Sequence, residues 1–400
     1  MRSYRELFRT PEFTPFFVAA SAQTVAQTMA GLALGTLVYR ATGSPLLSAV
    51  SMFGSSLVQV LGATFLLSAA DRLPPRAALT SLALLFAAAT AALALPGLSV
   101  AALFAIVLAR GLAESVGGGV RWGLLNEILT KDGYLLGRSV FNMMSGVMQI
   151  AGYATGGTLV ALLSPRASLL VAAGLYLAAA ATLRLGLTVR PPRTTGRPSV
   201  RATWRANALL WSSPPRRQVY LALWIPNGLV VGCESLYVSY APEAAGTLFA
   251  CAALGMLAGD VLVGRLLPPA LRRRLGFPLL LLLALPYVPF LLLPPLPLAA
   301  AAVTLASAGF GASLVQQERL VELTPDDMTG HALGLHSAGM LTMQGVAAAL
   351  AGSVAQLTSP AGAMTAMAAA SAAVTLLLMA ADGRVRRRPV AVPGGGGAGW

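Results

Sequence analysis

Three ionisable residues lie inside long apolar stretches of the sequence, where charges are rare. Arg110 and Glu114 are four residues apart, so they share one face of a helix and can form an ion pair. Glu234 has no arginine in its own stretch, which makes it the best single candidate for a carboxyl group that binds and releases protons. Two plainer interpretations stay open: an inert buried pair for Arg110 and Glu114, and a Glu234 side chain that reaches water near the outer end of its stretch.

Uncharged polar residues recur within several of the apolar stretches, at spacings of three, four or seven. Side chains at these spacings share one face of a helix, so they predict the lining of a cavity that holds a small molecule. Hydrogen bonding between helices would explain them equally well. The candidate cavity residues are Gln23, Gln27, Asn142, Gln149, Asn227 and Gln344.

Patterns that would indicate an enzyme are missing from the sequence. It has no cysteine or histidine cluster with metal-ligand spacing, no glycine-rich phosphate loop with its lysine and no nucleophile elbow. Cys233 and Cys251 both fall inside apolar stretches and indicate neither a disulfide nor a metal site. We therefore expect no catalytic residues, no metal and no cofactor.

The composition sets the class of protein that must position these residues. Of the 400 residues, 56% are hydrophobic and 10% charged, and a mean hydropathy of +0.73 leaves too little polar surface for a soluble globule. Apolar runs of about 20 residues, without the alternation of a barrel, predict an all-α membrane protein. The twelve predicted spans are residues 14–38, 45–69, 77–95, 98–119, 139–163, 168–188, 218–240, 245–264, 276–294, 297–316, 332–357 and 361–381.

The basic residues predict the orientation. A cytoplasmic N-terminus places all but three of the 28 basic residues on the cytoplasmic side, as the positive-inside rule requires. The exceptions are Arg40 and Arg166 outside and Arg110 within a span. This distribution accounts for the net charge of +14 without a nucleic-acid partner. We expect a multi-pass protein of the cytoplasmic (inner) cell membrane, with both termini in the cytoplasm.

The two halves of the chain resemble each other. A shift of about half the chain places Glu127 on Glu322 and Met148-Gln149 on Met343-Gln344, which indicates two copies of a six-helix bundle. A linker rich in proline and arginine, with a short interfacial helix, separates them. The predicted domains are an N-terminal bundle at 1–188, the cytoplasmic linker at 189–217, a C-terminal bundle at 218–383 and a disordered cytoplasmic tail at 384–400.

Two parallel six-helix halves joined by a cytoplasmic linker are similar to the plan of the major facilitator superfamily, whose halves rock about a site at the middle of the membrane. The loop from Ala70 to Arg76 resembles the cytoplasmic signature of that superfamily, with Leu67 and Pro74 in place of the expected glycines. The resemblance implies two bundles related by pseudo-two-fold symmetry, closed by a cytoplasmic gate. The gate candidates are Asp71, Arg72 and Arg76 in this loop and Asp260 and Arg265 at the matching turn.

Two further motifs resemble the exporters of that superfamily. The segment from Gly152 to Gly157 is similar to their fifth-span signature, with Tyr153 in place of proline. Arg110 lies where they carry a fourth-span arginine, although Glu114 stands where glycine is usual. The small residues form one face for close helix packing, either static or as a moving hinge. They are Gly152, Gly156 and Gly157.

The sequence contains no nucleotide-binding motif, so transport would draw on an ion gradient. We predict a monomeric secondary active transporter that exports a small, largely apolar compound in exchange for protons by alternating access. The titrating group is Glu234, Glu114 or Asp260. An importer or facilitator of the same fold is one alternative, and an integral membrane enzyme built on Glu114 and Arg110 is another. The excess of arginine over the single Lys131 indicates a GC-rich bacterial source.

Overall fold

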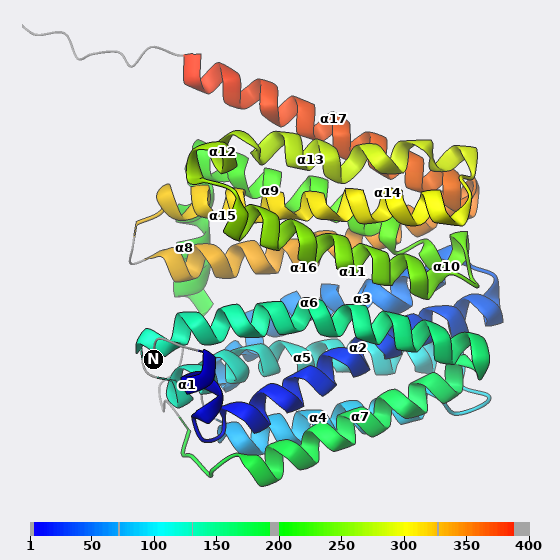
Figure 1. Ribbon diagram of the computed structural model, residues 1–400, viewed down its shortest axis with the longest axis vertical. Coiled ribbons are helices and arrows are strands. Elements are labelled where there is room, and N and C mark those ends of the chain that lie inside the picture. Colours follow the sequence, from blue (N-terminus) through cyan, green and yellow to red (C-terminus); the bar gives the residue numbers. More distant parts are fainter. Residues whose placement is uncertain (1–3, 71–72, 130, 193–199, 326–327, 388–400) are drawn as a thin grey trace, which may run out of the picture.

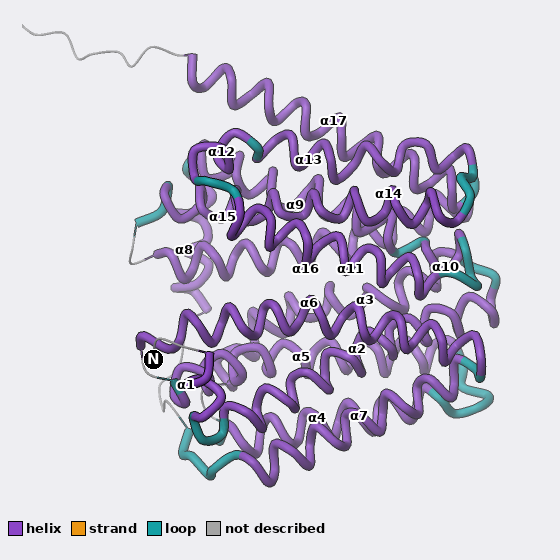
Figure 2. The backbone as a smooth tube through the Cα atoms, in the orientation of Figure 1, coloured by secondary structure: helices purple, strands orange, loops and turns teal. Residues whose placement is uncertain are grey.

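A computed structural model describes the chain apart from residues 1–3, 71–72, 130, 193–199, 326–327 and 388–400. Within the described part every regular element is a helix (Figure 2). Helices suit an apolar environment because each backbone N–H and C=O bonds within its own segment. The predicted all-α fold class is confirmed.

The first half of the chain folds into long helices joined by short turns. Two of these helices begin at serine caps, because the Oγ atoms of Ser99 and Ser164 accept hydrogen bonds from backbone N–H groups three residues on, at 3.2 and 3.0 Å. The helices are α1 (Tyr4–Arg9), α2 (Phe13–Thr42), α3 (Pro45–Ala70), α4 (Pro75–Leu93), α5 (Val100–Ile128), α6 (Lys131–Leu162) and α7 (Pro165–Gly186).

The second half is more broken, chiefly where prolines occur. Pro286 and Pro289 fall in a segment that adopts 3₁₀ geometry, so the predicted span at 276–294 consists of two helical pieces. The elements are α8 (Val200–Ser212), α9 (Pro214–Glu234), α10 (Tyr237–Tyr240), α11 (Ala245–Val261), the π-helix η1 (Leu262–Leu266), α12 (Pro269–Arg274), α13 (Gly276–Ala284), η2 (Leu285–Leu292), α14 (Leu296–Ala308), η3 (Gly309–Gly311), α15 (Ala312–Glu322), α16 (Thr329–Leu357) and α17 (Pro360–Arg387).

Length and composition identify the membrane-crossing helices. Among the described residues nine helical segments are long and apolar enough to span a bilayer. The protein is therefore a multi-pass membrane protein. All twelve predicted spans coincide with helical segments, but the count of twelve spans stays a prediction.

The helices form two bundles that lie side by side (Figure 1). Helices α2 to α7 pack around two apolar clusters, one containing Phe13 and Phe141 and the other Leu34 and Tyr176. Helices α9 to α17 surround one larger cluster. The bundles meet where α3 packs on α16 and α6 packs on α11. This arrangement agrees with the predicted fold, while the exact domain boundaries stay predictions.

One end of the molecule carries α1, α8 and α12 (Figure 1). We refer to it as the linker end, because α8 is the short helix predicted within the linker. α8 is attached to the C-terminal bundle, since Leu210 is fully buried and the Trp211 ring stacks on Trp224 of α9 at 5.5 Å. The sequence-based prediction places this end in the cytoplasm.

Candidate functional site

A cavity of about 350 Å³ lies between the two bundles. α3 and α6 supply one wall, and α9, α11, α15 and α16 supply the other. Of its sixteen lining residues, six are aromatic or methionine, four are aliphatic and six carry polar or charged side chains. The lining includes Phe53, Gln149, Tyr153, Glu234, Phe249, Met256, Asp260, Phe310, Gln317, Met340 and Gln344. A concave site that combines apolar walls with placed polar groups is typical of small-molecule binding.

Glu234 is the buried carboxyl group of this central cavity. It is the last residue of α9, and its side chain is only 5% exposed. Its Oε1 atom has no hydrogen-bond partner among the described residues. The nearby hydroxyl groups of Tyr237 and Tyr287 hydrogen-bond to each other, and Tyr153 stacks on Phe249 at 4.8 Å. Glu234 is thus an unpaired carboxyl group in largely aromatic surroundings, and it does not reach outer solvent.

Glu114 lies in a different setting inside the N-terminal bundle. Its two oxygens accept hydrogen bonds from Gln27 Nε2 at 2.7 Å and from Gln59 Nε2 at 2.9 Å. Two helical turns further along α5, Arg121 donates a hydrogen bond to the Oε1 atom of Gln23 at 3.0 Å. A small cavity of about 60 Å³ adjoins Gln27, Arg110 and Glu114. These residues form a hydrogen-bonded polar cluster within one bundle.

The predicted pairing of Arg110 with Glu114 is wrong. Arg110 donates to the Tyr176 hydroxyl at 3.1 Å, and its guanidinium lies 5.5 Å from the centre of the Phe86 ring. Glu114 is satisfied by the two glutamine amides of other helices. Helical spacing puts the two charges on one face, but partners on neighbouring helices compete better than a pair on a single helix.

Sequence reasoning missed Arg121. The predicted span ended at residue 119, which placed Arg121 in a cytoplasmic loop, whereas α5 continues to Ile128. Arg121 follows Glu114 by two helical turns, and that spacing was the signal that could have assigned it to the same polar face.

The structure separates the other predicted cavity residues. Gln149 and Gln344 line the central cavity, whereas Gln27 lines the small one. Asn227 is fully buried and donates to the Leu223 carbonyl of its own helix at 2.6 Å. Asn142 is exposed and lines neither of these two cavities.

The predicted gate residues also fall in different places. Asp71 and Arg72 lie outside the described residues. Arg76 donates to the Arg184 carbonyl at 2.5 Å, within the N-terminal bundle. Arg265 crosses between the bundles and donates to Ser139 Oγ at 3.2 Å, and Asp260 lines the central cavity.

The predicted glycine face contacts two helices. A Cβ atom on Gly156 would lie 3.1 Å from the Cα of Met29 on α2, and one on Gly152 would lie 2.9 Å from the Val25 carbonyl oxygen. On Gly157 it would lie 2.8 Å from the Cα of Gly246 on α11. Because these separations exclude a side chain, α6 approaches both its own bundle and the other one backbone to backbone.

Comparison with known proteins establishes the family. The sequence model of the Major Facilitator Superfamily matches residues 16–317, so the chain belongs to that superfamily. No curated protein matches the chain. Together with the fold, the family makes the protein a membrane transporter.

Solved structures of transporters share the fold. A POT family transporter in complex with a thioalcohol-conjugated peptide has a TM-score of 0.73 at 12% identity, covering 94% of this chain and 96% of its own. The nucleoside transporter NupG has a TM-score of 0.71 at 13% identity, with coverages of 92% and 98%. A bacterial homolog of the human lysosomal transporter Spinster, in an inward-facing conformation, has a TM-score of 0.70 at 13% identity, with coverages of 95% and 96%. Identities this low show a common fold alone.

Proposed function

We propose that this protein is a proton-coupled exporter of a small, largely apolar compound, acting by alternating access in the cell membrane. The observation that carries the proposal is Glu234, an unpaired buried carboxyl group that opens on the cavity between the bundles. Ionisable groups at membrane depth are costly and mark ion pathways. A carboxyl group at the point where two moving bundles meet can exchange protons with each side of the membrane in turn.

The lining of the central cavity supports the choice of substrate class. Phe53, Phe249, Phe310 and Met340 offer apolar and polarisable surface. The Gln149 and Gln344 amides can fix the orientation of a polar group on the compound. The volume of about 350 Å³ suits a small molecule.

In the proposed coupling cycle, a proton on Glu234 and the substrate in the cavity exclude each other. In the state open to the outside, the Glu234 carboxylate takes up a proton and the substrate leaves. The neutral carboxyl group allows the empty cavity to close, because an unpaired buried charge is unfavourable in apolar surroundings. In the state open to the cytoplasm, the proton leaves and the substrate enters, and a polar group of the substrate then hydrogen-bonds to the Glu234 carboxylate so that the loaded cavity can close. One proton thus moves inward as one substrate molecule moves outward.

Contacts at the two ends of the bundle interface fit this rocking motion. At the end remote from the linker, Gly157 lies against Gly246, and Ser44 Oγ donates to Gln356 Oε1 at 3.1 Å. At the linker end Arg265 bonds to Ser139 across the interface. We propose Arg265, Asp260 and Arg76, with Asp71 and Arg72, as the cytoplasmic gate. The outward direction rests on the resemblance of the Gly152–Gly157 segment and Arg110 to exporter motifs.

Purified protein in proteoliposomes tests this function. A pH-sensitive dye sealed inside reports proton movement when compounds from an apolar library are added under an imposed pH gradient. An exchanger moves protons opposite to the compound, and Glu234→Gln abolishes that movement while sparing substrate binding. Protons that travel with the compound would identify an importer, and transport without any proton movement would identify a facilitator.

A further inference from the structure

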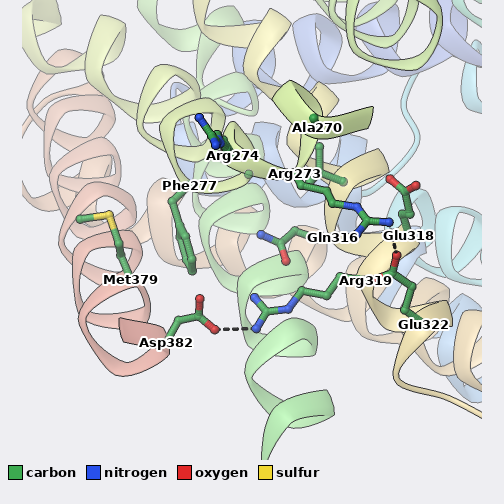
Figure 3. Close-up of a pocket in the computed structure, with 12 residues that line it drawn as sticks. Ala270, Arg273, Arg274, Phe277, Gln316, Glu318, Arg319, Glu322, Met379 and Asp382 are labelled. Atoms are coloured by element: carbon green, nitrogen blue, oxygen red, sulfur yellow. Dashed lines mark hydrogen bonds and ion pairs between the residues drawn. The ribbon is translucent and has the colours of Figure 1, made fainter. Parts of the chain in front are cut away.

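A second and larger cavity lies inside the C-terminal bundle at the linker end. Its volume is about 680 Å³, and its walls come from α12, α13, α15 and α17 (Figure 3). It shares no lining residue with the central cavity. The proposed transport cycle makes no use of it.

Three arginine–carboxylate pairs surround this cavity, and a fourth arginine beside it is not part of any of these pairs. The pairs are Arg272–Glu318 at 2.8 Å, Arg273–Glu322 at 2.9 Å and Arg319–Asp382 at 2.5 Å. Arg274 also lines the cavity and has no acidic partner among the described residues. Among the described residues in these pairs and the cavity lining, arginines therefore outnumber carboxylates by one.

The cavity also presents a free amide and an apolar side. Gln316 is 3% exposed, and its side chain makes no hydrogen bond within the described part of the chain. It lies between Arg273 and Arg319 (Figure 3). Because Gln316 lines the cavity, its amide can donate a hydrogen bond to a ligand there. Phe277 and Met379 supply apolar surface, and Met379 is 42% exposed.

We propose that this cavity binds the headgroup of an anionic glycerophospholipid. Its phosphodiester accepts hydrogen bonds from Arg274 and Gln316, and its negative charge is attracted by the Arg274 guanidinium. The glycerol and the first chain carbons lie against Phe277 and Met379. The cavity is level with the ends of the spans, where a bilayer places its headgroups.

Native mass spectrometry of the full-length protein in detergent, titrated with phosphatidylglycerol, tests the proposal. Arg274→Gln weakens binding about tenfold, because a charge-assisted hydrogen bond is lost, and Gln316→Leu weakens it by a smaller factor. Arg217→Gln is the matched control, since Arg217 is an exposed arginine of α9 that lines neither cavity. It leaves binding unchanged.

Two further titrations separate the sources of the phosphate. Phosphatidylcholine binds more weakly than phosphatidylglycerol, and inorganic phosphate binds weakly because it lacks the apolar contacts. The proposal is overturned by wild-type affinity in Arg274→Gln, by equal binding of the two lipids, or by inorganic phosphate binding as tightly as phosphatidylglycerol. Because Arg274 is exposed, its substitution leaves the fold intact, and an unchanged melting temperature in lipid-free detergent verifies this.

Discussion

Two carboxyl groups, the half-buried Glu114 and the buried Glu234, have contrasting surroundings. In the N-terminal bundle Glu114 accepts hydrogen bonds from Gln27 and Gln59. In the C-terminal bundle Glu234 lies in a cavity with Tyr153 and Phe249, and its Oε1 atom lacks a partner in the described structure. One group is held by its neighbours and the other is not. We therefore assign a fixed structural role to Glu114 and the exchange of protons to Glu234.

The largest expected effect comes from replacing each glutamate by glutamine. Glutamine keeps the size of the side chain but cannot exchange a proton, so Glu234→Gln reduces gradient-driven transport to the level of protein-free liposomes. Glu114→Gln keeps a transport rate that responds to the pH gradient. Proteoliposome flux measurements check both, with the exposed Glu243→Gln as control. Gradient-driven flux through Glu234→Gln would reverse the assignment.

The same two substitutions differ in their effect on stability. Glu114→Gln lowers the free energy of unfolding by about 1–3 kcal/mol, because one of two amide donors then faces another amide donor. Glu234→Gln leaves it nearly unchanged, since Oε1 of Glu234 has no hydrogen bond to lose. Unfolding in mixed micelles measures both values. Equal destabilisation by the two variants would remove the contrast between the sites.

Removing one donor from Glu114 has a smaller effect. Gln59→Leu deletes one of the two hydrogen bonds and leaves the one from Gln27. The free energy of unfolding falls by about 1.5 kcal/mol, the lower bound for a hydrogen bond to a charged group. The same micelle assay measures it. A variant as stable as the wild type would show that Glu114 does not depend on its glutamine partners.

Glu12, which directly precedes α2 outside the spans, provides a paired glutamate for reference. Partial burial alone would raise its pKa, but hydrogen bonds from Arg190 and Thr188 outweigh this and lower the pKa below its ordinary value. The two Arg190 bonds are 2.5 and 3.0 Å long. Because Arg190 is partly exposed, Arg190→Gln lowers the free energy of unfolding by only about 1 kcal/mol.

The pH dependence follows from that lowered pKa. The stabilisation by Glu12 is fully present above the pKa of an unfolded glutamate and is lost as the pH falls through the lower folded-state pKa. The wild type should therefore lose stability on acidification relative to Arg190→Gln, and the difference between the two should vanish at low pH. Unfolding midpoints across acidic pH measure it. A difference that is independent of pH would contradict the pairing.

The sequence predicted the fold well because its signals are local. The apolar stretches and the placement of arginines depend only on the membrane, and every predicted span coincides with a helical segment. The family model confirmed the superfamily that the Asp71 loop had suggested, whereas the exporter character suggested by Gly152–Gly157 stays a prediction. The ends of helices were less accurate, since α5 extends past its apolar stretch and carries Arg121 into the bundle.

The site was only partly predictable because its partners come from distant helices. Glu234 was singled out by its isolation in an apolar stretch, but its burial depends on where α9 ends. Arg110 bonds to Tyr176 instead of Glu114, and Glu114 bonds to Gln27 and Gln59. No spacing within a single helix encodes those contacts.

Infrared difference spectroscopy on substrate binding tests the central claim most directly. Binding of a transported compound to wild-type protein is predicted to remove the carbonyl band of one protonated carboxyl group as its proton is released. That change is absent in Glu234→Gln and persists in Glu114→Gln. A band that persists in Glu234→Gln and disappears in Glu114→Gln would show that the proton is carried in the other bundle.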